Sequence, residues 1–113
     1  MSHVKGILVQ TAQGWFCLDP NDQVVSKCLI DSGAYGLREI ETAKRFLNAS
    51  FKILLVGAHV GTIAVPISKL CRELVAIEAN PDTYQLLALN LLLNRCSNVA
   101  SHAVTRMRPF HSL

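Results

Sequence analysis

Short apolar runs alternate with polar breaks along the chain, and their lengths predict an α/β protein. The two clearest runs are residues 53–56 (Ile-Leu-Leu-Val) and residues 74–77 (Leu-Val-Ala-Ile). Runs of this length are typical of strands buried on both faces of a parallel sheet. Between them, residues 62–72 carry apolar side chains at helical spacing, which predicts a crossover helix that Pro66 should make irregular. The pattern therefore predicts a strand, helix, strand unit with its crevice at the carboxyl ends of both strands.

A second helix is predicted over residues 80–94, directly after the second strand. Asn80 is a suitable N-cap, and Pro81 stands at the first helical position, where its missing N–H costs nothing. Leucines cover nearly all sides of this helix, so it should be buried against the sheet and another element. The sheet alone is too small to cover it, and we expect an uncovered apolar surface that favours self-association. Residues 99–104 then predict a third strand, after which no further element is indicated.

The first fifty residues have a different pattern, which predicts a small β-hairpin followed by helices. Residues 6–10 and 15–18 read as two apolar strands joined by a polar turn. A turn cluster follows, in which either Asn21 or Asp22 can cap a short helix. A clearer helix with one apolar stripe is predicted over residues 37–48, and it should cover the sheet.

The chain length limits how much of such a fold can be present. A complete doubly wound sheet needs about 150 residues or more, and the chain has 113. The expected fold class is therefore α/β, with a Rossmann-like doubly wound parallel sheet that is incomplete (its N-terminal half) and is preceded by a small β-hairpin and helical segment. Two parts are expected: residues 1–50 as the hairpin with covering helices, and residues 51–113 as the partial ligand-binding domain.

Composition and charge exclude several other classes of protein. Hydrophobic residues make up 50% of the chain and charged residues 17%, which excludes a disordered or highly charged tail. The net charge of +3 is spread along the sequence, and the nearest approach to a basic cluster is Arg106 with Arg108. No aromatic residues are interleaved with these arginines, so no nucleic-acid partner is expected.

Cysteine usage and the N-terminus favour a cytoplasmic protein. The four cysteines stand far apart without a C-x-x-C pair, so neither a metal site nor a disulfide framework is indicated, and buried free thiols are expected. The first residues lack the basic and then apolar profile of a signal peptide. The longest uncharged run, residues 53–68, is short and interrupted by two glycines and Pro66, so no membrane span is expected.

A glycine turn after the first strand and an acid after the second form the candidate binding site. Gly57 and Gly61 allow a sharp turn and a close approach of the backbone to a ligand. Glu78 follows the second strand at about the 20-residue interval at which a carboxylate accepts hydrogen bonds from ribose hydroxyls. Dinucleotides and S-adenosylmethionine both use this arrangement, but a dinucleotide fingerprint would need glycine where the chain has His59 and Thr62. S-adenosylmethionine has no phosphate, so side chains at those positions are tolerated.

Three segments together resemble the FkbM family of S-adenosylmethionine-dependent methyltransferases. They are residues 56–62 (Val-Gly-Ala-His-Val-Gly-Thr), residues 75–81 (Val-Ala-Ile-Glu-Ala-Asn-Pro) and residues 91–94 (Leu-Leu-Leu-Asn). The resemblance spans about residues 33–104 and implies an S-adenosylmethionine-binding Rossmann-like domain over residues 51–113. It also implies the cofactor-binding residues, with the acid on the ribose: Gly57, Ala58, His59, Gly61, Glu78 and Ala79.

The same resemblance implies methyl transfer to an oxygen atom of a small molecule or sugar. The chain departs from the family in two ways. The family commonly has an aspartate two residues before the first loop glycine, and Leu55 stands there, which removes a polar anchor near the methionine end of the cofactor. Family members also continue past the third or fourth strand. We therefore expect an N-terminal part of such an enzyme, from a truncated or frame-shifted reading frame, with reduced or no activity.

Several alternatives stay open on the sequence alone. A glycine turn can join a strand to a helix without any ligand. The chain can also be a nicotinamide-dependent oxidoreductase half-domain, or a degenerate, non-catalytic interaction module. His59 can contact the cofactor or point to solvent, and His102 can line the crevice or be an ordinary half-buried histidine. Spacing gives no arrangement of serine or cysteine with histidine and an acid, so the catalytic residues are unknown.

Overall fold

The structure is a computed structural model that describes residues 3–104 of the chain. The predicted hairpin, helices and third strand are all present in this part. Arg106 and Arg108, the nearest approach to a basic cluster, lie outside the described residues. In chain order the elements are β1 (Ile7–Thr11), β2 (Gly14–Leu18), α1 (Val25–Ser32), α2 (Leu37–Phe46), β3 (Lys52–Val56), α3 (Ala64–Ser68), β4 (Glu73–Glu78), α4 (Pro81–Leu93) and β5 (Val99–Ala103).

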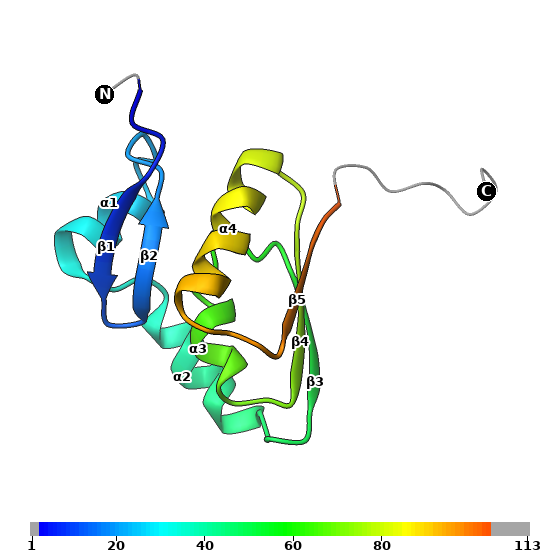
Figure 1. The fold of residues 1–113 in the computed structure, drawn as a ribbon. Coiled ribbons are helices and arrows are strands. Elements are labelled where there is room, and N and C mark those ends of the chain that lie inside the picture. Colours follow the sequence, from blue (N-terminus) through cyan, green and yellow to red (C-terminus); the bar gives the residue numbers. More distant parts are fainter. Residues whose placement is uncertain (1–2, 105–113) are drawn as a thin grey trace, which may run out of the picture.

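The two sheets confirm the predicted α/β fold class. Strands β1 and β2 form an antiparallel hairpin, and β3, β4 and β5 form a parallel sheet in that order. The pairs β3 with β4 and β4 with β5 run in the same direction, so their carboxyl ends meet at one edge of the sheet. Figure 1 shows α3 and α4 on one side of this sheet, with the hairpin packed on the far side of α4.

The opposite face of the parallel sheet is largely uncovered in the described residues. Two rows of neighbouring side chains lie on this face. Leu54 of β3 is beside Val75 of β4, and Val56 of β3 is beside Ile77 of β4, which is beside His102 of β5. Leu54 is 64% exposed and Val56 is 70% exposed. His102 is exposed on this face, so it neither lines the crevice nor is half-buried. The expected uncovered apolar surface therefore includes the outer face of the sheet.

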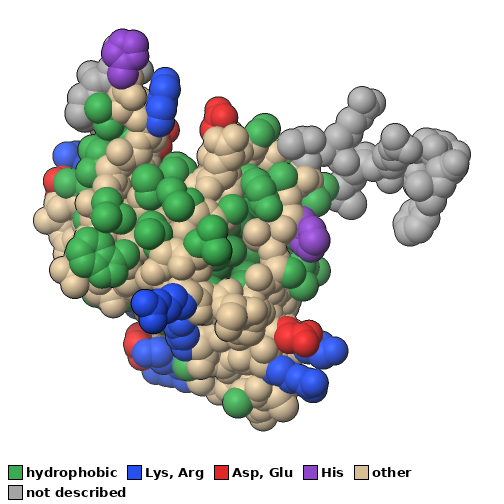
Figure 2. Space-filling view, viewed as in Figure 1, with side chains coloured by type: hydrophobic (Ala, Val, Ile, Leu, Met, Phe, Trp, Pro, Cys, Tyr) green, Lys and Arg blue, Asp and Glu red, His purple; other side chains and the backbone are tan. Residues whose placement is uncertain are grey.

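Helix α4 is buried on two sides, as its leucine-rich sequence predicted. Leu87 and Leu91 are buried in a core that also contains Phe16 of the hairpin and Leu74 of the sheet. Leu92 is 77% exposed, and Figure 2 shows hydrophobic side chains gathered over the hairpin and α4 on this face. Uncovered apolar surface therefore lies on α4 as well as on the sheet, and self-association through it stays a prediction.

Two asparagines, Asn90 in α4 and Asn94 at its C-cap, hold the hairpin against the helix. The backbone N–H of Cys17 donates to Oδ1 of Asn90 (2.7 Å), and Nδ2 of Asn90 donates to the carbonyl of Cys17 (3.1 Å). One turn later, Asn94 forms the same reciprocal pair with the backbone of Trp15, at 3.0 Å and 2.7 Å. These side-chain amides satisfy the free edge of β2 in place of another strand.

Helix α3 is shorter than the predicted crossover helix over residues 62–72. Pro66 lacks the N–H that would bond the carbonyl of Thr62, so the regular hydrogen-bond pattern is broken in the first turn. Nε2 of Gln13, in the hairpin turn, donates to that free carbonyl instead (2.7 Å). The last N–H groups bond three residues back, as in the 2.8 Å bond from Leu70 to Ile67, and the helix ends.

The four cysteines are free thiols. Cys71 and Cys96 are buried as expected, whereas Cys17 is half-buried and Cys28 is exposed on α1. Burial raises the pKa of the Cys71 thiol. The expectation of buried thiols therefore holds for only two of the four cysteines.

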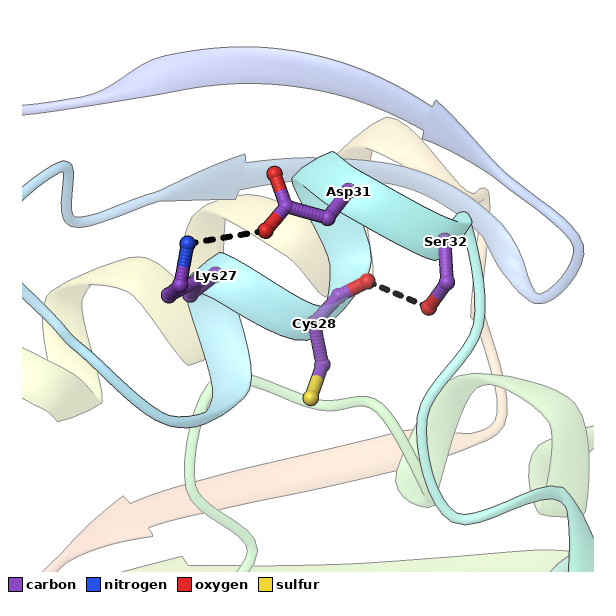
Figure 3. A network of polar contacts seen from close by, with 4 residues as sticks. All are labelled: Lys27, Cys28, Asp31 and Ser32. Carbon is purple, nitrogen blue, oxygen red and sulfur yellow. Dashed lines mark hydrogen bonds and ion pairs between the residues drawn. The ribbon is translucent and has the colours of Figure 1, made fainter.

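The exposed side of α1 carries a local network of polar contacts. Nζ of Lys27 pairs with a carboxylate oxygen of Asp31 one turn later (2.9 Å), and this bond raises the pKa of Lys27. The hydroxyl of Ser32 donates to the carbonyl of Cys28 (2.7 Å), as Figure 3 shows. Such exposed contacts stabilise a helix only slightly, because water competes for both partners.

No helix in the described residues is long and apolar enough to cross a bilayer.

Candidate functional site

The turn from β3 to α3 contains two glycines with different surroundings. Both have left-handed backbones, with φ of 75° at Gly57 and 101° at Gly61. A Cβ added at Gly57 would meet no heavy atom within 4 Å, whereas a Cβ at Gly61 would lie 3.3 Å from Leu87. Gly57 therefore faces open space, and Gly61 lets the loop pack closely on the core.

The glycine loop is held against the end of β4 by backbone hydrogen bonds. The N–H groups of Gly57 and Ala58 both donate to the carbonyl of Ile77, at 2.8 Å and 2.9 Å. Ala58 is buried by this contact. The loop and the carboxyl end of β4 thus form one rigid unit, which is a suitable support for a ligand.

Glu78 connects this unit to the start of α4. Its Oε1 accepts from the backbone N–H of His59 (2.8 Å), and its Oε2 accepts from the backbone N–H of Asn80 (3.0 Å). Each carboxylate oxygen has a second lone pair that these bonds leave free. The Glu78 side chain is half-buried, so the carboxylate can accept further hydrogen bonds from a ligand at the edge of the sheet.

His59 has an unfavourable backbone and an unpaired ring nitrogen. Its φ is 53°, in the left-handed region that a residue with a Cβ adopts at a cost of about 1–3 kcal/mol when the fold imposes it. Its Nδ1 is buried and has no hydrogen-bond partner among the described residues. The ring therefore does not simply point to solvent. Strain and an unpaired nitrogen together are typical of a residue kept for binding rather than for stability.

Two cavities meet at His59. The first, which we call the loop cavity, has a volume of about 310 Å³. It is lined by residues of β3, of the glycine loop and of the first fifty residues, among them Val25, Tyr35, Leu55, Gly57, Ala58 and His59. Leu55 contributes an apolar side chain to this part of the wall.

The second cavity, which we call the acidic cavity, has a volume of about 640 Å³. It lies between the N-terminal segment, the turn before α1, the glycine loop and the first turn of α4. Its lining includes Lys5, Asp19, Asp22, His59, Asp82 and Thr83. Asp22 lies two residues before the N-cap Val24 of α1, and its two carboxylate oxygens accept from the N–H groups of Val24 (3.0 Å) and Ser26 (3.1 Å).

The structure brings most of the predicted site residues together. Gly57, Ala58 and His59 line the loop cavity, and Glu78 is bonded to the loop behind them. Ala79 is exposed beside Glu78, and Gly61 is buried. Neither cavity is lined by Gly61, Glu78 or Ala79.

The sequence analysis missed the contribution of the N-terminal part to this site. Val25, Tyr35 and Asp22 line the cavities although they belong to a segment predicted only to cover the sheet. Among these three residues, only Asp22 stood in a recognisable sequence feature, the predicted turn cluster. In the part of the chain that the structure describes, no group of three His, Cys, Asp or Glu side chains is placed to hold a metal ion.

Comparison with known proteins gives matches at the level of structure. No protein-family model matches the chain, and no curated protein matches it. M. jannaschii TYW2 in complex with AdoMet is 23% identical with a TM-score of 0.68, over 89% of this chain and 44% of that one. The M. jannaschii tRNA m1G37 methyltransferase is 16% identical with a TM-score of 0.69, over 91% and 31%. The protein in a complex of aTrm5 and tRNALeu is 16% identical with a TM-score of 0.69, and the match covers 95% of this chain and 30% of that one.

These matches show the fold. The chain spans 30–44% of the length of the three solved structures, and the matched region extends over 89–95% of its own residues. The hairpin, α1 and the parallel sheet therefore belong to one arrangement that also occurs in those proteins. The chain has the Rossmann-like fold of S-adenosylmethionine-dependent methyltransferases.

Proposed function

We propose that the glycine loop and Glu78 bind S-adenosylmethionine and that the chain is part of a methyltransferase. The observation that carries this proposal is the position of Glu78, which holds the loop through His59 and keeps free lone pairs at the edge of the sheet. The open space over Gly57 supports it, because a ligand there meets bare backbone. A solved structure with the same fold holds AdoMet.

Each predicted residue has a distinct part in this proposal. The Glu78 carboxylate accepts hydrogen bonds from the ribose hydroxyls, and Ala79 flanks the ribose. Gly57, Ala58 and His59 form the wall of the loop cavity, and Gly61 keeps this wall on the core. S-adenosylmethionine supplies an activated methyl group on its sulfonium, so the protein has chiefly to bind and orient the two reactants.

The family and the acceptor are the finer parts of the proposal. The residues around Gly57 and Glu78 support the FkbM family, and with it transfer to an oxygen atom of a small molecule or sugar. Residues 1–50 would then cover a partial cofactor-binding domain formed by residues 51–113. Leu55 lines the loop cavity in place of a carboxylate, so we expect weak cofactor binding.

A tRNA acceptor is the second candidate. The matches to a tRNA m1G37 methyltransferase and to a complex with tRNALeu cover 91% and 95% of this chain and so extend into its N-terminal hairpin. One of these proteins methylates tRNA and the other is bound to tRNALeu, which supports tRNA as a partner and weakens the expectation that no nucleic acid is involved. A nicotinamide-dependent oxidoreductase and a non-catalytic module are the remaining alternatives.

A thermal-shift experiment on the full chain tests the cofactor. We expect S-adenosylhomocysteine to raise the melting temperature and NAD to leave it unchanged, because His59 stands where a dinucleotide needs glycine. A ligand that binds only the folded state stabilises it by about 2.7 kcal/mol at a hundredfold excess over Kd. A shift with NAD alone would sink the methyltransferase proposal, and no shift with either ligand would favour the non-catalytic module.

Replacing Glu78 with alanine should weaken cofactor binding. The loss of hydrogen bonds to a charged group predicts a decrease of about 1.5–3 kcal/mol in the free energy of binding. Glu73→Ala is the matched control, because Glu73 begins the same strand and its exposed side chain pairs with Lys52 at 3.8 Å, at the other end of the sheet. Calorimetry with S-adenosylhomocysteine measures both variants, and equal affinities would remove Glu78 from the site.

A further inference from the structure

The acidic cavity is large enough for a molecule of its own. Its volume of about 640 Å³ is about twice that of the loop cavity. Sites for small molecules usually have volumes of about 300–1,000 Å³. Four segments far apart in the sequence contribute to the wall, represented by Lys5, Asp22, His59 and Asp82. The cavity is therefore a product of the whole fold and not of one loop.

The charge of the lining selects the kind of molecule. Asp19, Asp22 and Asp82 contribute three carboxylates, and Lys5 contributes one ammonium group, which leaves an excess of two negative charges. Burial raises the pKa of Asp22, but the N–H groups of Val24 and Ser26 and the nearby His59 lower it, so its pKa lies below the ordinary value. An ionised wall of this kind attracts a cation and repels phosphate.

The positions of the carboxylates favour an organic cation over a metal ion. No three His, Cys, Asp or Glu side chains converge on one point among residues 3–104. A single ion would therefore contact too few of these side chains, whereas an extended molecule with several amino groups can reach them separately. The Lys and Arg side chains visible in Figure 2 lie mostly at the lower end of that face, away from the carboxyl ends of the strands. This distribution does not favour a phosphate backbone near the cavity.

His59 connects this cavity to the glycine loop. Its side chain lines both cavities, and its buried Nδ1 lacks a partner among the described residues. A molecule in the acidic cavity thus lies next to the loop that is proposed to hold the cofactor.

We propose that the acidic cavity binds an amine-bearing small molecule, such as an amino sugar, whose ammonium groups pair with Asp19, Asp22 and Asp82 beside His59 of the glycine loop. This inference rests on the proposed function, in which such a molecule carries the hydroxyl that accepts the methyl group. It names the substrate class by its charge, and it places the N-terminal part of the chain in substrate binding.

Calorimetric titration of the full chain at low salt tests this proposal. The probe is neamine, a small amino sugar with several amino groups, and trehalose serves as an uncharged sugar of similar size. Neamine should bind at least about tenfold more tightly than trehalose, which corresponds to 1.4 kcal/mol. Equal binding of the two sugars would overturn the amine assignment.

Paired variants separate the cavity from the overall charge of the protein. Asp19→Asn with Asp82→Asn should weaken neamine binding about tenfold or more, because both carboxylates line the cavity and Asn retains their size. Asp31→Asn with Glu73→Gln removes the same charge from exposed positions outside the cavity and should change binding less than about twofold. Equal weakening by the two pairs would show that neamine binds only through net charge and would overturn the site.

The melting shift with S-adenosylhomocysteine distinguishes the two levels of the proposal. In the Asp19→Asn and Asp82→Asn variant we expect this shift to be unchanged, because neither side chain lines the loop cavity. A normal shift without neamine binding in the unaltered chain would reject the acidic cavity alone. No melting shift in the unaltered chain would reject the cofactor site. The acidic cavity would still be supported in that case if neamine bound and its binding depended on Asp19 and Asp82.

Discussion

Gly57→Ala is expected to remove binding of S-adenosylhomocysteine while leaving the chain folded. The added Cβ meets no protein atom within 4 Å, so it creates no clash in the free protein. It would occupy the space in which the cofactor is proposed to approach the loop backbone. We expect the affinity to fall by about a hundredfold or more, equal to about 2.7 kcal/mol. Calorimetric titration with S-adenosylhomocysteine measures this loss.

The matched control for this substitution is Gly33→Ala. Gly33 has a φ of 73°, close to the 75° of Gly57, and a Cβ there also meets nothing within 4 Å. It caps the end of α1 and lines neither cavity. Both variants should lose about 1–2 kcal/mol of stability, because alanine is strained in the left-handed region. Only Gly57→Ala should lose the ligand, and equal ligand affinity in the two variants would show that the cofactor does not approach Gly57.

Local signals in the sequence were sufficient to predict most of the elements. The strand after residue 52 and the strand before Glu78 follow from apolar runs of the right length, and both are present in parallel register. The predicted N-cap of α4 is also confirmed, since Oδ1 of Asn80 accepts from the N–H groups of Asp82 (3.0 Å) and Thr83 (3.2 Å). Each of these features depends on residues within a few positions of one another, which is the range over which sequence patterns are informative.

Contacts between distant segments could not be predicted in this way. Gln13 replaces the hydrogen bond that Pro66 cannot make to Thr62, across 49 residues of sequence, and so helps to fix where α3 lies. Glu78 was predicted to hold a ribose, but its bonds to His59 and Asn80 also make it a structural link between two loops. The cavities depend on the same kind of contact. The N-terminal part lies beside the glycine loop because α4 holds the hairpin in place.

The contact between α4 and the hairpin is therefore decisive for the stability of the chain. Asn90 is fully buried, and besides its two bonds to Cys17 it donates through Nδ2 to the carbonyl of Val60 in the glycine loop (2.8 Å). One side chain thus joins the hairpin, α4 and the candidate site. Asn94 contacts the hairpin in the same way but is only half-buried, so water can replace its bonds.

Asn90→Ala should consequently destabilise the fold more than any surface substitution. Truncation leaves the buried carbonyl of Val60 and the partly buried N–H and carbonyl of Cys17 without this partner, and we expect a loss of about 3 kcal/mol in the free energy of unfolding. Asn94→Ala, the matched control, should cost about 1 kcal/mol because its partners are reached by water. Urea unfolding followed by circular dichroism measures both. Equal losses in the two variants would contradict the central position of Asn90, and no loss in either would mean that the hairpin does not depend on α4 for its place in the fold.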